Sequence, residues 1–249
     1  MDRLPGSAKS ASLCCILCLF LSPTLFATTY DLQSDWNTIN PNGTWSFLQG
    51  STLLPYHSAC GFFSPACPPS PNPPGYLPIW AQWTATPNPP YILPGDIWTH
   101  SVDSFNGNPN LGESTLRWTA PSAGIISISG DTWYSHGVCP TGCFSRSNDF
   151  SLSLNGTILA TGTVSGPLGA NYHDLTNPLT FSASGLTVHS GDIVSMVFVR
   201  SVGQAAGMEE GLNLTITESA PGVPEPSSLL LLATGLTGVG GLIGRKLRG

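Results

Sequence analysis

The chain has 249 residues, enough for one domain of ordinary size plus peripheral segments. Only 9% of the residues are charged, against about 25% in typical soluble domains, while glycine and proline together number 51. This composition excludes a Lys/Glu-rich helical bundle or coiled coil. The net charge of −6 argues against a nucleic-acid partner, because binding to phosphates needs a basic face.

The N-terminus is predicted to be a secretory signal peptide, residues 1–27. Arg3 and Lys9 precede an apolar stretch from Leu13 to Leu21, and cleavage is expected near the small residue Ala27. An uncleaved anchor is the alternative, although the apolar run is shorter than the roughly 20 residues that span a membrane.

Residues 28–222 are predicted to form one exported all-β domain, an antiparallel β-sandwich. They contain three basic and twelve acidic residues, a balance of −9, which favours solubility. Asn155-Gly156 is the preferred pair for a type I′ hairpin, and no helical pattern precedes residue 227. Short runs with strand-like alternation or strand-forming residues lie at 114–119, 125–129, 151–154, 179–182, 185–188, 193–199 and 212–217.

A proline-rich insertion, Ser64–Pro94, holds 11 prolines in 31 residues. Such a segment cannot be a central strand, because proline has no N–H to donate to a sheet. Its rings at Trp80, Trp83 and Tyr91 are the predicted ligand-binding residues, since prolines stiffen the backbone that presents them to a sugar. The alternative is that these rings cover a face of the sandwich as an accessory core.

Four cysteines remain after removal of the signal peptide: Cys60, Cys67, Cys139 and Cys143. An even number in an exported chain predicts two disulfides, most simply Cys60 with Cys67 and Cys139 with Cys143, although three connectivities are open. Zinc is the alternative, because His136 lies close to Cys139 and Cys143, and Cys60 or Cys67 would supply the fourth ligand.

The sequence predicts no catalytic residues and no resident cofactor. Neither a GxSxG nor an HExxH motif occurs. The five histidines are scattered singly and are each interpreted as loop or surface residues: His57, His100, His136, His173 and His189.

The adjacent Glu209 and Glu210 would face opposite sides of a strand and could not act as a pair. In a loop they could instead join Asp149 or Asp174 in a calcium site, since oxygen ligands suffice for that ion. Arg117, in the predicted strand 114–119, is expected to pair with Glu113 or with solvent.

The C-terminal segment 223–249 reads as a membrane-associated signal. Ser227 to Ile243 is an uncharged run of 17 residues at the short limit for a membrane span, and Arg245, Lys246 and Arg248 follow directly. Just before it stands Val223-Pro224-Glu225-Pro226, whose prolines keep the backbone extended.

This Pro-Glu-Pro motif, the short Leu/Gly-rich helix and the basic end resemble the PEP-CTERM sorting signal of Gram-negative bacteria. The resemblance implies processing by an exosortase, a membrane-embedded transpeptidase-like enzyme, in bacteria that make exopolysaccharide. It makes Val223, Pro224, Glu225 and Pro226 a substrate site for that enzyme. The chain would be anchored in the inner membrane through residues 227–243 before processing and then be held at the cell surface.

Residues 30–217 are also similar to an exported β-sandwich family that is common in such bacteria. The similarity lies in Asn40-Pro41-Asn42-Gly43-Thr44-Trp45, in Arg117-Trp118-Thr119-Ala120-Pro121 and in Leu186-Thr187-Val188-His189-Ser190-Gly191-Asp192. It implies a fold like the jelly rolls of carbohydrate-binding modules and brings no enzymatic activity with it.

The function expected from these features is that of a non-catalytic surface protein that interacts with the envelope, or with exopolysaccharide in a biofilm matrix. The alternative is a carbohydrate-active enzyme on a jelly-roll scaffold, a glycoside hydrolase or a polysaccharide lyase. A hydrolase needs two carboxyl groups about 5 to 10 Å apart in a groove, whereas a binding module needs only a platform of aromatic rings.

Overall fold

The computed structural model describes residues 27–37, 39–54, 78–101, 113–136, 144–204 and 206–219. These residues contain twelve β-strands and no helix. The signal peptide, the four cysteines, the start of the proline-rich insertion and the C-terminal signal lie outside these residues, apart from Ala27. No helix among the described residues is long and apolar enough to cross a membrane. The strands are β1 (Thr28–Asp31), β2 (Trp45–Gln49), β3 (Thr52–Leu53), β4 (Ile79–Gln82), β5 (Ile97–His100), β6 (Ser114–Thr119), β7 (Gly124–Tyr134), β8 (Ser147–Leu154), β9 (Thr157–Ser165), β10 (Leu179–Val188), β11 (Ile193–Arg200) and β12 (Glu209–Ser219).

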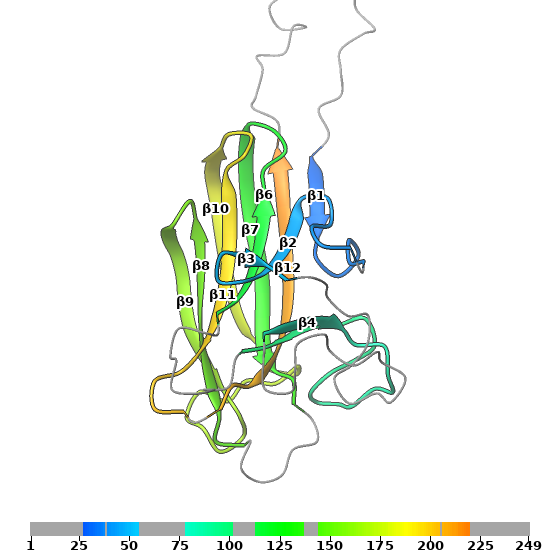
Figure 1. The fold of residues 1–249 in the computed structure, drawn as a ribbon, viewed down its shortest axis with the longest axis vertical. Helices are drawn as coiled ribbons and strands as arrows, with labels where there is room; N and C mark the ends of the chain where they lie inside the picture. Colours follow the sequence, from blue (N-terminus) through cyan, green and yellow to red (C-terminus); the bar gives the residue numbers. More distant parts are fainter. Residues whose placement is uncertain are drawn as a thin grey trace, which may run out of the picture. The chain divides into compact units, whose positions relative to one another are not determined.

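The strands form two six-stranded sheets, and the strand pairs with a defined register are antiparallel (Figure 1). The first sheet has the order β10-β7-β12-β5-β4, and β1 also pairs with β12. The second sheet has the order β3-β2-β6-β11-β8-β9. This confirms the predicted antiparallel β-sandwich.

Aromatic rings from both sheets fill the space between them. Trp80 of β4 is fully buried, with its ring centroid 5.6 Å from that of Phe47 in β2 and 5.9 Å from that of Phe198 in β11. Phe150 of β8 contacts Phe181 of β10 in the same way, with centroids 5.7 Å apart. These contacts join the sheets face to face, at the geometry that aromatic pairs prefer.

Local sequence explains the strands that were predicted. In β7, Ile126 and Ile128 are buried while Ile125 is 43% exposed, so one side faces the core and the other faces outward. The Asn155-Gly156 hairpin joins β8 to β9 with positive φ at both residues, 49° and 81°, as a type I′ turn requires. β4, inside the proline-rich insertion, lies at an edge of its sheet, where missing N–H donors are tolerated.

The ring of Trp133 packs directly on the backbone of Gly211 in β12, so only glycine fits at position 211. A Cβ atom at position 211 would lie 2.2 Å from the Trp133 ring. Trp133 is fully buried and donates its Nε1–H to the Tyr91 carbonyl at 2.6 Å, so the ring cannot move aside.

We therefore expect Gly211→Ala to lower the free energy of unfolding by about 3 kcal/mol, through overpacking. Gly156→Ala is the matched control, because its Cβ would meet nothing within 4 Å and only the positive φ is penalised, by about 1 kcal/mol. Urea denaturation of both variants checks this. Equal losses for the two would show that Trp133 does relax.

Candidate functional site

The three predicted ligand-binding rings occupy different environments. Trp80 is part of the main core, so its ring is not accessible to a ligand. Tyr91 is half-buried against Tyr134, with ring centroids 5.8 Å apart. Trp83 is also half-buried and packs on a small cluster that contains Trp98. The three rings therefore do not form one shared platform, and only Trp83 and Tyr91 are partly exposed.

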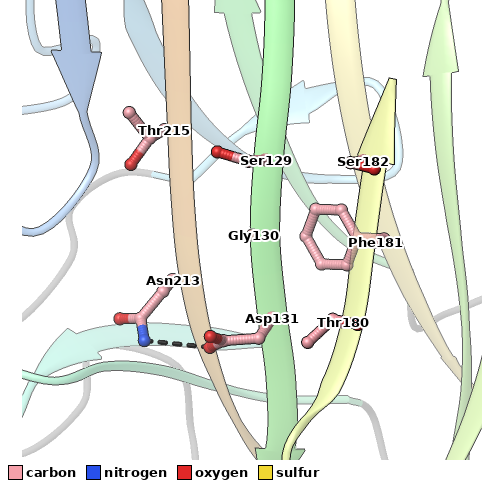
Figure 2. A pocket seen from close by; sticks show the side chains of 8 residues that line it. All are labelled: Ser129, Gly130, Asp131, Thr180, Phe181, Ser182, Asn213 and Thr215. Carbon is pink, nitrogen blue, oxygen red and sulfur yellow. Dashed lines mark hydrogen bonds between the residues drawn. The ribbon is translucent and has the colours of Figure 1, made fainter. Parts of the chain in front are cut away.

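A shallow hollow of about 490 Å³ lies over β10, β7 and β12 of the first sheet (Figure 2). Its lining is rich in hydroxyl groups: Ser129 and Ser182 are cross-strand neighbours, and Thr180 lies opposite Asp131. In Figure 2 the amide of Asn213 points at Asp131, and its Nδ2–H donates to the carboxylate at 2.9 Å. The hollow is a polar surface on the face of a rigid sheet.

The polar groups of this hollow continue toward Trp83. Burial raises the pKa of Asp131, while the Asn213 hydrogen bond opposes that rise. Asp96, directly before β5, has its pKa raised mainly by burial, and the charge of Asp131 adds to this. Trp83 donates its backbone N–H to the Asp96 carbonyl at 2.8 Å, so its backbone is the next neighbour of Asp96 across the sheet. We call Thr180, Asp131, Asn213, Asp96 and Trp83 the transverse row.

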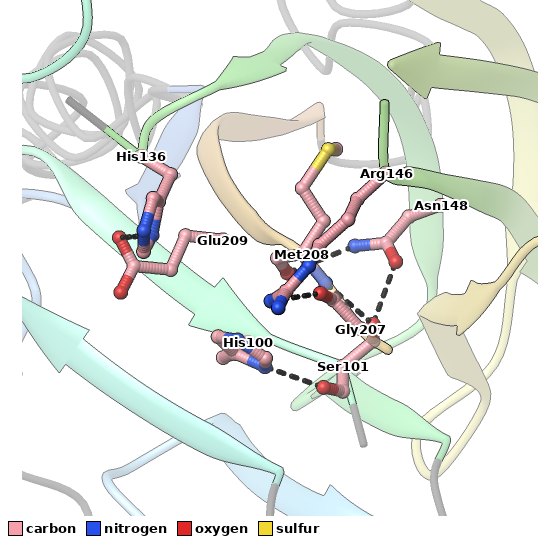
Figure 3. A network of polar contacts seen from close by, with 8 residues as sticks. All are labelled: His100, Ser101, His136, Arg146, Asn148, Gly207, Met208 and Glu209. Atoms are coloured by element: carbon pink, nitrogen blue, oxygen red, sulfur yellow. Dashed lines mark hydrogen bonds and ion pairs between the residues drawn. The ribbon is translucent and has the colours of Figure 1, made fainter. Parts of the chain in front are cut away.

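Glu209 and Glu210 begin β12 and point to opposite sides of it, as alternation predicts. Glu209 forms an ion pair with His136, 2.8 Å between Oε2 and Nδ1, and both side chains are about nine-tenths buried (Figure 3). The interpretation of His100 as a loop or surface residue is wrong, because His100 is buried in β5 opposite Glu209. His136 lies in the loop after β7, as interpreted, but it is buried.

No metal centre forms from the residues suggested for zinc or calcium within the described part of the chain. No three His, Cys, Asp or Glu side chains gather there in a group able to hold an ion. Asp149 accepts hydrogen bonds from Thr163 and Ser201, and Asp174 accepts one from Tyr172. The cysteines proposed as zinc ligands or disulfide partners lie outside the described residues.

A polar network between the two sheets was missed by sequence reasoning. Figure 3 shows Asn148 of β8 donating to the Met208 carbonyl at 3.1 Å and accepting at Oδ1 from Ser101 at 2.6 Å. Asn148 also donates to Glu210 Oε2 at 3.1 Å. Arg146 donates to the Gly207 carbonyl at 3.0 Å. Arg146, Asn148 and Glu210 span more than 60 residues, so no motif in the sequence indicates the network. Only the pairing of the strands brings these residues together.

Glu210 is best satisfied as a neutral acid. Thr132 Oγ1 has one proton, yet it lies 2.8 Å from both Glu210 Oε1 and the Gly211 carbonyl. A protonated Glu210 donates to Thr132 and leaves the threonine proton for Gly211, so every group is paired. Burial raises the pKa of Glu210 to about 8, and its hydrogen bonds only partly oppose this rise.

The raised pKa of Glu210 predicts that stability falls as pH rises. Between about pH 4.5 and 8, the folded chain holds a proton that the unfolded chain has released, so the free energy of unfolding decreases with pH in this window and levels off above it. Glu210→Gln mimics the neutral acid and should remove this slope, making the variant the more stable protein above pH 8. Denaturation midpoints from pH 5 to 9 check this; parallel profiles for the two proteins would contradict it.

Comparison with known proteins adds information at the C-terminus. Residues 222–246 match the PEP-CTERM protein-sorting motif. Among curated proteins, none matches this chain. Similar solved structures include the carbohydrate-binding module TmCBM61 in complex with β-1,4-galactotriose, with 11% identity, 50% of this chain and 70% of that chain covered, and a TM-score of 0.28.

Two further solved structures are similar to this chain at comparably low sequence identity. The CBM36-1 domain of a multidomain xylanase, from the hindgut metagenome of Trinervitermes trinervoides, has 9% identity, covers 49% of this chain and 86% of that chain, and gives a TM-score of 0.27. A cleaved adhesin domain of Lys-gingipain from Porphyromonas gingivalis has 11% identity, covers 79% of this chain and 99% of that chain, and gives a TM-score of 0.37. The chain thus combines a β-sandwich with a PEP-CTERM sorting motif.

Proposed function

We propose that this protein is exported, processed by an exosortase at its C-terminal signal and held at the cell surface as a non-catalytic polysaccharide-interaction protein. The observation that carries this proposal is the PEP-CTERM motif at residues 222–246, directly after β12 ends at Ser219. The motif therefore follows in sequence the domain it would deliver, and Val223-Pro224-Glu225-Pro226 is its proposed substrate segment.

The transverse row supports an uncharged polysaccharide as the ligand. Asp131 accepts hydrogen bonds, and Asn213 both donates and accepts them, so the pair can bind neighbouring hydroxyl groups of one sugar. The partly exposed Trp83 ring offers an apolar surface for a sugar face. The carboxyl groups of Asp131 and Asp96 lie close enough to interact, and they disfavour an anionic sugar here, so a neutral polymer is favoured at this face.

Replacing Pro224-Glu225-Pro226 by three alanines should abolish processing. The variant is expected to stay in the membrane fraction at its unprocessed mass, while the wild-type chain ends near this motif. Mass spectrometry of surface-extracted protein measures the C-terminal peptide. Mature surface chains that retain Arg245 to Gly249 would contradict exosortase processing.

Asp131→Ala should weaken retention in affinity electrophoresis on the producer's own polysaccharide by about tenfold, through loss of a charge-assisted hydrogen bond. Ser127→Ala is the matched control, because Ser127 is exposed on the same face of β7 but lies outside the hollow. Equal retention of both variants would exclude this face. Release of reducing ends from the polysaccharide, abolished by Asp131→Asn, would instead support the glycoside hydrolase alternative, with Asp96 and Asp131 as its carboxyl pair.

A further inference from the structure

Arg117, on the second sheet, forms no ion pair or side-chain hydrogen bond with another described residue. Within the described residues the basic side chains are Arg117, Arg146 and Arg200; Arg146 binds the Gly207 carbonyl and Arg200 also has a bonded neighbour. Arg117 Nε is buried and has no hydrogen-bond partner among the described residues. An unsatisfied guanidinium donor in an acidic domain needs an explanation, because a buried donor left unpaired is costly.

The expected pairing of Arg117 with Glu113 does not form. On a strand, residues four apart are about 13 Å apart along the backbone, whereas on a helix they would be neighbours. The register shows instead that Ser46 of β2 and Ser195 of β11 lie on either side of Arg117, and Ser153 of β8 follows Ser195. Arg117 therefore lies in a row of serine hydroxyls across four strands.

A second unsatisfied group lies on the same face of β6. Thr115 is two residues before Arg117, so both side chains point away from the core that Leu116 and Trp118 enter. Thr115 is 2% exposed, and its Oγ1 also has no hydrogen-bond partner within the described residues. Among the described residues, two neighbouring groups able to donate, one of them charged, thus have no acceptor.

We propose that this row, centred on Arg117, binds the carboxylate of an acidic sugar residue in a polysaccharide. A planar guanidinium pairs with a carboxylate through two parallel hydrogen bonds. The overall balance of −9 disfavours a dianion such as phosphate more than a single carboxylate. Ser46 and Ser195 each lie one strand spacing, about 4.8 Å, from Arg117, and they match a ligand that carries hydroxyl groups beside its carboxylate, which an acidic peptide lacks.

This site is separate from the transverse row, which lies on the other sheet. Leu116 and Trp118 of β6 enter the core between the sheets, so Arg117 points outward from the second sheet, whereas Asp131 lines a hollow of the first. The two sites would give the domain one face for neutral sugar and another for a carboxylate. Either site can fail without the other.

The test measures binding of a short oligogalacturonate and of its methyl ester to the full chain in mild detergent by titration calorimetry. The two probes have the same sugar rings and differ only in charge. The wild-type protein should bind the acid at least tenfold more tightly than the ester. Arg117→Gln should abolish that preference, and Arg117→Lys should restore only part of it, because lysine keeps the charge without the planar fork.

Arg200→Gln is the control, because it removes one positive charge from the same sheet at the end of β11. It should keep the preference for the acid. Unchanged melting temperatures for the Arg117 variants would show that they are folded, and the Arg117→Lys result provides a second readout if Arg117→Gln is unstable. Equal binding of acid and ester, equal losses for Arg200→Gln, or equally tight binding of inorganic phosphate or a polyglutamate peptide would each overturn the proposal.

Discussion

The fold depends on aromatic packing between two sheets. Trp80 lies between Phe47 and Phe198, and Phe150 meets Phe181, so rings from both sheets exclude water from the interior. Ion pairs contribute little, because charged residues are scarce. Burial of these large rings, together with the aliphatic side chains around them, drives folding. The ring of Trp80 therefore stabilises the core, although it belongs to the segment that was expected to bind a ligand.

Once the rings are buried, strand alternation turns every second side chain outward, and the two outer faces become chemically different. The first sheet presents Asp131 and Asn213 beside hydroxyl groups, and the second presents Arg117 among serines. Both faces rest on rigid backbone, so little conformational entropy would be lost when they bind a ligand. The two proposed sites would together bind neutral and acidic parts of a matrix.

The domain buries two of its few acidic side chains, Glu209 and Glu210, at the start of β12. Glu210 lies between the sheets with Thr132 and Asn148, while Glu209 pairs with His136 on the other side of β12. The two carboxyl groups differ: both oxygens of Glu210 have hydrogen-bond partners, whereas Glu209 contacts His136 through Oε2 and its buried Oε1 has no hydrogen-bond partner among the described residues. Such a network specifies one strand arrangement, since any other register would leave these groups unpaired.

The sequence by itself determined the elements whose cause is local. Alternation around Ile126 and Ile128 predicts β7, Asn155-Gly156 predicts the hairpin between β8 and β9, and the Pro-Glu-Pro motif with its apolar run predicts the sorting signal. These three features depend on the period of the side chains, on backbone φ and on the order of residues. All three are properties of residues that are close together in sequence. Only the tertiary structure decided that Trp80 is core, that Glu210 meets Asn148 and that Arg117 lies between Ser46 and Ser195. Those outcomes depend on which strands pair and in which register, and such long-range pairing is set by the packing of the whole sandwich rather than by any segment of it.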